Sequence, residues 1–118
     1  MTIERIQAGP RMSEAVIHNR TVYLAGQVAS ESLRGSVAEQ TKDILMAIDA
    51  LLAEAKTDKT KILSATIFLT DMSAFAEMNR IWDAWVVPGA TPARATVATP
   101  HLSSPDFKVE ISIVAAQL

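Results

Sequence analysis

Residues 36–70 read SVAEQTKDILMAIDALLAEAKTDKTKILSATIFLT, a helical pattern followed directly by a strand pattern. Ser36 and Glu39 have the Ser-x-x-Glu spacing of a capping box, in which each side chain bonds the other residue's free backbone N–H. Apolar side chains then recur at helical spacing as far as Ala55, while most charged residues fall on the other side. The pattern predicts an amphipathic helix over residues 37–55 with one face in the core.

Residues 62–70 are rich in β-branched and aromatic side chains, which predicts a strand in the interior of a sheet. Upstream of the helix, residues 15–18 and 21–25 are two β-rich runs separated by Asn19-Arg20. Two residues between such runs are typical of a hairpin, and Asn tolerates the positive φ that a tight turn requires. Residues 3–6 predict a further short strand at an edge.

The second half of the chain predicts one more helix and two more strands. We expect Asp71 or Ser73 to cap a helix that reaches about residue 86 and ends before Pro88-Gly89. Residues 94–98 and 109–116 predict the last two strands. Two helices on one face of a mixed sheet give an α+β sandwich. The buried stripe of the second helix is predicted to comprise Phe75, Met78, Trp82 and Trp85.

The composition limits the classes of function. The 118 residues, 49% of them hydrophobic, suit a single domain over residues 1–118. Because the chain has no cysteine and only two separated histidines, disulfides, thiolate metal sites and the usual zinc spacings are excluded. The net charge of −2 disfavours nucleic acid as a partner. No apolar run approaches the ~20 residues that span a bilayer, and the first residues lack a signal-peptide pattern, so we expect a cytoplasmic protein without a membrane partner.

Two helices can cover only one face of the predicted sheet, yet its strands carry apolar side chains on both faces. Phe68 and Thr66 alternate with the buried positions of one strand, and Val114 lies beside Glu110 on another. This second face is too apolar for water alone, so we expect other copies of the chain to cover it.

Arg94 and Glu110 are the two charged residues that the pattern places on strands among small or apolar neighbours. A guanidinium presents a planar fork that matches a carboxylate, so Arg94 is a candidate anion-binding residue; the alternative is a structural ion pair or an edge residue whose charge reaches water. A lone carboxylate on an apolar strand must be paired or protonated. Glu110 therefore positions a water or, as the alternative, pairs with Arg94 or Lys108.

Three further residues have plainer interpretations. Asn79 falls on the stripe that should be buried, which favours a structural clamp that bonds backbone or a loop. Gly26 and Gln27 follow a strand end and lack the glycine spacing of a phosphate loop, which favours a tight turn.

Several ordered motifs, none of them strong alone, resemble the YjgF/RidA family over nearly the whole chain. The chain is most similar to a side branch of that family rather than to its best-characterised deaminase group. The motifs are Gly9-Pro10, Ser13-x-Ala15, Val22-Tyr-Leu-Ala-Gly26-Gln27, Ile67-Phe-Leu-Thr-Asp71, Phe75 with Asn79, Pro92-Ala-Arg94 and Val109-Glu110-Ile111.

The resemblance implies a chorismate-mutase-like fold and a homotrimer with three clefts between subunits. It also implies hydrolysis of reactive enamines and imines to 2-oxo acids and ammonia without a cofactor or metal. In the family pattern, Arg94 holds the carboxylate of a small metabolite and Glu110 places the attacking water. Gly26 and Gln27 border the cleft.

Two positions of the cleft wall depart from the family pattern. Met12 stands where the deaminases usually have Tyr, and Ala25 stands where they often have Ser. These substrate-facing departures leave an alternative, in which the same clefts bind or sense small 2-oxo or other carboxylate metabolites without turnover. An endoribonuclease label that some members carry is a third choice, because the charge balance is acidic.

Overall fold

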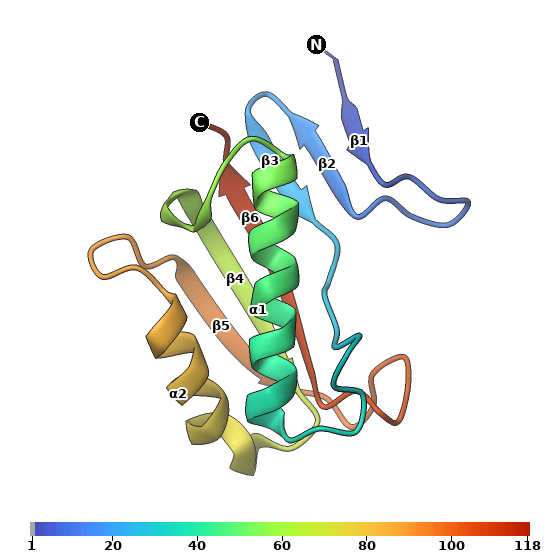
Figure 1. The fold of residues 1–118 in the computed structure, drawn as a ribbon, viewed down its shortest axis with the longest axis vertical. Coiled ribbons are helices and arrows are strands. Elements are labelled where there is room, and N and C mark those ends of the chain that lie inside the picture. Colours follow the sequence, from blue (N-terminus) through green and yellow to red (C-terminus); the bar gives the residue numbers. More distant parts are fainter. Residues whose placement is uncertain (1) are drawn as a thin grey trace.

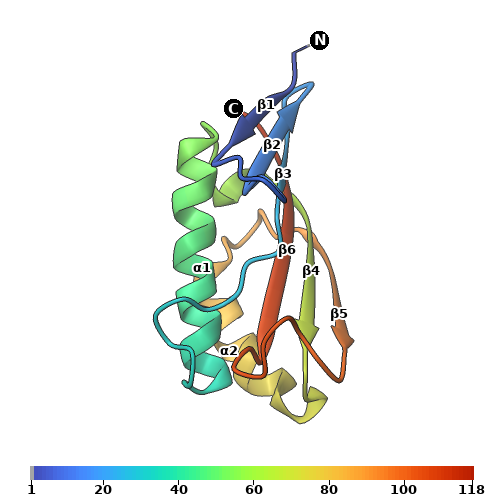
Figure 2. The same cartoon turned by 90° about the vertical axis from the view of Figure 1, so that its right-hand side faces the viewer.

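The computed structural model describes residues 2–118 and consists of one six-stranded mixed sheet with two helices on one of its faces (Figures 1 and 2). The strand order is β1-β2-β3-β6-β4-β5, and β4 and β5 form the parallel pair of a sheet whose other pairings are antiparallel. The strands are β1 (Glu4–Ile6), β2 (Ala15–His18), β3 (Thr21–Leu24), β4 (Ile62–Leu69), β5 (Ala93–Ala98) and β6 (Val109–Ala116). The helices are α1 (Val37–Glu54) and α2 (Phe75–Trp85), and the 3-10 turns are η1 (Lys59–Lys61) and η2 (Met72–Ala74). This confirms the predicted α+β fold.

The capping box and the amphipathic pattern of α1 are both confirmed. Ser36 Oγ accepts a hydrogen bond from the Glu39 N–H at 3.1 Å, and the Ser36 N–H donates to Glu39 Oε1 at 2.9 Å. The apolar face of α1 is buried against the sheet, where Ile44, Ile48 and Leu52 are fully enclosed. No helix within residues 2–118 is both long enough and apolar enough to cross a membrane.

The predicted hairpin is also confirmed, with an unusual residue in its turn. Asn19 and Arg20 have φ values of 52° and 61°, so both adopt the left-handed conformation that a two-residue hairpin turn requires. The flanking register pairs His18 with Thr21. Arg20 thus takes a conformation that Asn and Gly adopt more readily.

The start of α2 differs from the prediction. Asp71 accepts the Ser73 N–H at 2.9 Å and thereby caps the short turn η2, while α2 begins after Ala74 without a side-chain cap. Met78 and Trp82 are buried as predicted, but Phe75 is 40% exposed. Phe75 is the first residue of the helix, and its ring lies beside the Arg94 guanidinium instead of in the core.

The face of the sheet opposite the helices is uncovered within the chain, as the edge-on view shows (Figure 2). Strand alternation sends every second side chain of β4, β5 and β6 to this face. It exposes Tyr23, Leu63 and Val97, which are large apolar residues on three different strands.

The loop between β3 and α1 is held by polar side chains of α1. Asp43 Oδ2 accepts the backbone N–H groups of residues 30, 31 and 32 at 2.9–3.2 Å. Burial raises the pKa of the Asp43 carboxyl, but these N–H donors and the Ser32 hydroxyl outweigh burial and hold that pKa below its ordinary value. Gln40 is fully buried, and its amide donates to the carbonyls of Leu33 and Asp106 and accepts the Lys108 N–H.

Gln40→Leu should destabilise the protein by about 3 kcal/mol, because two carbonyls and one N–H lose their partners in the interior. Urea unfolding followed by circular dichroism measures the change. Ala53→Leu, on the exposed side of the same helix, is the control and should change the free energy of unfolding by less than about 0.5 kcal/mol. Equal effects of the two variants would contradict a special role of the Gln40 amide.

Candidate functional site

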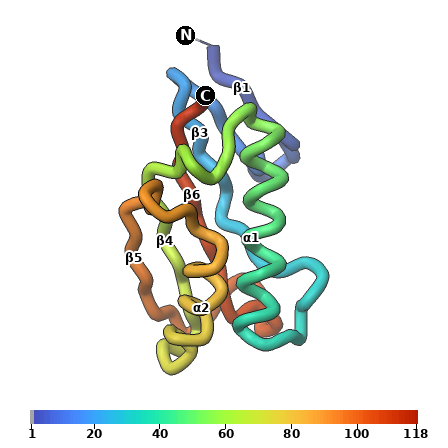
Figure 3. Tube along the Cα trace, turned by 60° about the vertical axis from the view of Figure 1, so that its left-hand side comes forward, coloured from blue at the N-terminus to red at the C-terminus, as the bar shows by residue number. Residues whose placement is uncertain are grey.

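Arg94 lies on the edge strand β5 and faces α2, which covers this part of the sheet (Figure 3). Its Nη1 donates to Oδ1 of Asn79 at 2.7 Å. Its guanidinium carbon lies 5.8 Å from the ring centroid of Phe75 and 5.4 Å from that of Trp82. The spacing of these three residues along α2 places them on one helical face, because residues four and seven apart lie above one another. One face of α2 therefore orients the guanidinium with an amide and two rings.

The partners of the Arg94 guanidinium are all neutral. Within residues 2–118 it has no carboxylate partner, so the structural ion pair considered from the sequence is absent. A guanidinium carries five N–H donors, and one of them is engaged by Asn79. The remaining donors have no hydrogen-bond partner within residues 2–118. Asn79 does act as a clamp, but it holds this side chain and not the backbone or loop that we expected.

Glu110 lies on the other face of the sheet. In β6, Val109 and Ile111 are fully buried under the helices, so the intervening Glu110 projects to the open face. Its register partner on β4 is Phe68, whereas Arg94 is paired with the buried Ala65. The sheet thus separates Glu110 from Arg94 within one chain. Lys108, the other partner considered from the sequence, donates its Nζ to the Gly35 carbonyl at 2.8 Å.

Gly26 makes room for the Glu110 carboxylate. A Cβ built on Gly26 would lie 2.1 Å from Glu110 Oε2 and 2.9 Å from its carboxyl carbon. Non-bonded atoms do not approach this closely, so position 26 must lack a Cβ for Glu110 to keep its place. The structure therefore brings Gly26 and Glu110 together.

Gln27 continues the sheet by one step but turns its side chain away from Glu110. Its backbone exchanges two hydrogen bonds with Ile111 at 2.8 and 3.0 Å. Its amide donates to Glu14 Oε1 at 3.2 Å and to the Ala25 carbonyl at 2.9 Å. It lines a cavity of about 230 Å³ between this segment and α1, which is distinct from the open face.

Met12 and Ala25 lie on two segments that are joined by backbone. The Ala25 N–H donates to the Glu14 carbonyl at 2.9 Å, which holds the loop between β1 and β2 beside the end of β3. Met12 is 50% exposed in that loop. Both positions lack a hydroxyl, and neither contacts Arg94 in the same chain.

Sequence reasoning missed three residues around Arg94. The contacts of Phe75 and Trp82 with Arg94 are not predicted, although the spacing of both residues with Asn79 on one helical face can be found in the sequence. The predicted core position is confirmed for Trp82 and wrong for Phe75. Thr96, two residues after Arg94 on the same strand face, has a buried hydroxyl without a hydrogen-bond partner within residues 2–118. The same part of the chain contains no group of three or more His, Asp or Glu residues that could hold a metal ion.

Gly26→Ala should destabilise the protein by about 0.5–1.5 kcal/mol, because the added methyl group forces the flexible Glu110 side chain out of its present rotamer. Gly9→Ala is the matched control, since its Cβ would meet its nearest neighbour at an ordinary 3.5 Å. In a Glu110→Ala background, where the carboxylate is gone, Gly26→Ala should cost much less stability than it does in the wild type. If Gly26→Ala costs the same in both backgrounds in urea unfolding, Glu110 is not what it meets.

Comparison with known proteins identifies the family. The family model described as "Endoribonuclease L-PSP" matches residues 2–117. The RutC family protein YoaB of Escherichia coli K12 is 51% identical over 116 residues, which cover 98% of this chain and 99% of the relative. The 2-iminobutanoate/2-iminopropanoate deaminase of Rattus norvegicus is 31% identical over 110 residues, which cover 89% of this chain and 79% of that protein.

A solved structure of a member of the YjgF protein family from Neisseria meningitidis is also similar. It superposes with a TM-score of 0.96 at 46% identity and covers 100% of this chain and 97% of its own. The match of the family model over nearly the whole chain, the YoaB relative and this structure agree with the sequence motifs and the sheet order. The chain belongs to the YjgF/RidA family.

Proposed function

We propose that the protein hydrolyses 2-imino acids to 2-oxo acids and ammonia, in sites where Arg94 of one copy meets Glu110 of another. The observation that carries this proposal is the uncompensated Arg94 guanidinium, which Asn79 orients without neutralising it. The relative named 2-iminobutanoate/2-iminopropanoate deaminase supports the choice of reaction.

The separation of the two residues supports a site shared between copies. Arg94 faces α2 at the β5 edge, while Glu110 faces the open side of β6. A contact between these two different surfaces is heterologous, and a heterologous contact that closes gives a ring. A homotrimer of this kind would bury the exposed Tyr23, Leu63 and Val97 of the open face and would contain three equivalent sites.

The reaction asks little of the protein beyond positioning. The substrate carboxylate binds the free N–H donors of Arg94, which fixes the imino carbon at the cleft. Glu110 accepts a hydrogen bond from a water and directs its oxygen to that carbon. The water oxygen bonds to the iminium carbon while the π electrons of the C=N bond move to nitrogen, and one water proton passes to that nitrogen. The C–N bond of the resulting carbinolamine then breaks, the hydroxyl proton passes to the departing nitrogen, and the products are the 2-oxo acid and ammonium. Because an iminium carbon is already electrophilic, orientation supplies the main effect, which reaches ~7–11 kcal/mol at its extreme.

A second candidate is binding of small carboxylates without turnover, and the residues at the cleft wall favour it. Met12 and Ala25 place no hydroxyl donors there. This function uses the same Arg94 guanidinium and predicts saturable binding of a 2-oxo acid with no change in the rate of imine hydrolysis.

Arg94→Ala should abolish catalysis, and Asn79→Asp should reduce it at least about tenfold, because the new carboxylate pairs with the guanidinium in place of the substrate. The assay generates 2-imino acids with an amino-acid oxidase and follows semicarbazone formation with and without the protein. Asn19→Asp, the same substitution in the distant β2–β3 turn, is the control and should leave the rate unchanged. Full activity of Asn79→Asp would contradict an anion site at Arg94.

Mixing two inactive variants tests whether the site is shared between copies. Arg94→Ala and Glu110→Gln should each be inactive alone, but joint refolding at equal amounts should restore about a quarter of the wild-type sites, since one ordered pair in four has both residues. The double variant refolded with Arg94→Ala is the control and should stay inactive. Absence of recovery in mixed oligomers that native mass spectrometry detects would contradict a site shared between copies.

A further inference from the structure

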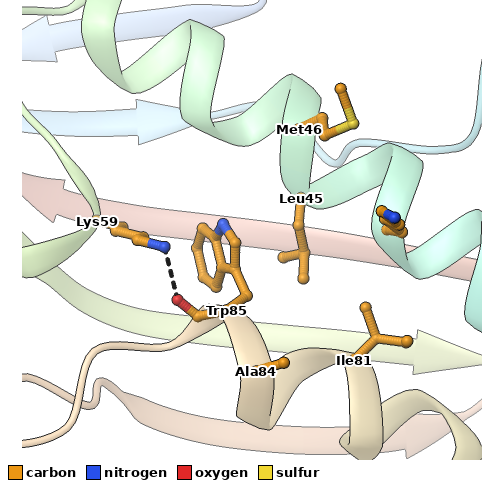
Figure 4. Close-up of a pocket in the computed structure, with 7 residues that line it drawn as sticks. Leu45, Met46, Lys59, Ile81, Ala84 and Trp85 are labelled. Carbon is orange, nitrogen blue, oxygen red and sulfur yellow. Dashed lines mark hydrogen bonds between the residues drawn. The ribbon is translucent and has the colours of Figure 1, made fainter.

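The outer layer of the molecule contains an apolar groove between α1 and α2. Its volume is about 340 Å³, within the range of small-molecule sites. The two helices run side by side in the same direction (Figure 1). Near their N-terminal ends the Ala38 N–H of α1 donates to Glu77 of α2, and near their C-terminal ends the Trp85 indole of α2 donates to Asp49 of α1. The groove is lined by Lys42, Leu45 and Met46 of α1, by Ile81, Ala84 and Trp85 of α2, and by Lys59 of η1 (Figure 4).

The groove is separate from the Arg94 site. The residues of α2 that contact Arg94 are Phe75, Asn79 and Trp82, and none of them lines the groove. The two helices that line the groove lie on the side of the sheet away from the open face (Figure 2). The proposed contact between copies uses the open face and the Arg94 side of α2, whose residues differ from those that line the groove.

The floor and walls of the groove leave apolar surface in contact with water. Met46 is 66% exposed on the side of α1 that is otherwise polar, so it contributes nothing to the core. Ile81 and Trp85 are only half-buried. Figure 4 shows the Trp85 ring between Lys59 and Leu45, with Ile81 on the next turn of α2. The Trp85 indole N–H donates to Asp49 Oδ2 at 3.0 Å, which fixes the ring as a wall.

A fixed cation closes one end of this apolar surface. Lys59 Nζ donates to the Trp85 carbonyl at 2.8 Å and lies 5.2 Å from the Trp85 ring centroid. An ammonium has three donors, so Lys59 keeps two for a ligand. Lys42 lies one helical turn before Met46 on the same side of α1. The lining therefore has two cations and no carboxylate, which complements an anion.

We propose that this groove binds small amphipathic carboxylates, with the apolar body along Leu45, Ile81 and Trp85 and the carboxylate at Lys59. The limited volume favours a small molecule as the ligand. A bound protein helix would present an apolar stripe longer than the groove between α1 and α2. The proposed deaminase activity plays no part in this inference, because the two sites share no residue.

Three amphiphiles of equal chain length test the proposal: octanoate, 1-octanol and octylammonium, each titrated in calorimetry below its micelle concentration. Octanoate should bind most tightly. Lys59→Met should weaken octanoate about fivefold while leaving octanol unchanged, as expected for one partly exposed charge pair. Ala84→Phe adds a ring to an exposed lining position and should abolish binding of octanoate.

Two controls keep the result specific. Arg94→Ala should bind octanoate as the wild type does, which separates this groove from the proposed catalytic site. Lys42→Gln removes the other cation of the lining but keeps the contacts of Lys59 with Trp85, so this variant should still bind octanoate more tightly than octanol. Equal affinity for all three amphiphiles, retained binding in Ala84→Phe, or loss in Arg94→Ala would each overturn the proposal.

Discussion

The alternation of side chains along β5 and β6 is the constraint on which the functional interpretation depends. A strand sends successive residues to opposite faces, and only one face of this sheet is covered by helices. The Arg94 side chain points to the covered face and the Glu110 side chain to the open one. A slip of one residue in β6 would move Val109, Ile111 and Ile113 out of the core, so the core itself fixes which face Glu110 takes. The face of Arg94 follows from the register of β5 with β4. The two charges therefore cannot serve one site unless a second copy supplies one of them.

The environment of Arg94 shows how a half-buried charge is oriented without being neutralised. A carboxylate in place of Asn79 would give a stronger contact but would also occupy the cation. The amide oxygen accepts one N–H, and the faces of Phe75 and Trp82 stabilise the guanidinium through their quadrupoles. An uncompensated cation in such surroundings is an exception to ordinary charge pairing, and exceptions of this kind concentrate at functional sites.

Periodicity predicted most of the fold but only part of the site. The capping box, α1 and the alternation in β6 follow from local patterns, so their bounds and buried faces could be predicted. The face of the sheet to which Arg94 points could not be predicted, because its neighbours Ala95 and Thr96 are small and show no alternation of apolar and polar side chains. The contact of Gly26 with Glu110 joins residues far apart in the chain, and a glycine after a strand end predicts only a turn. Long-range contacts of this kind become visible once the sheet is assembled.

The cleft residues also constrain the reaction that the proposed site can catalyse. Because Met12 and Ala25 carry no hydroxyl group, Arg94 and Glu110 are the side chains of the proposed site that can stabilise charge during the reaction. Hydrolysis of an unactivated amide or ester needs hydrogen-bond donors that stabilise a developing oxyanion. The loss of a single such donor raises the barrier by about 3 kcal/mol. A protonated imine already carries its positive charge beside the carbon under attack, so it gains electrons during water addition and needs no oxyanion hole. Among carboxylate-bearing substrates of hydrolysis, a 2-imino acid is therefore the class that suits these residues best, because they need only bind its carboxylate and position a water.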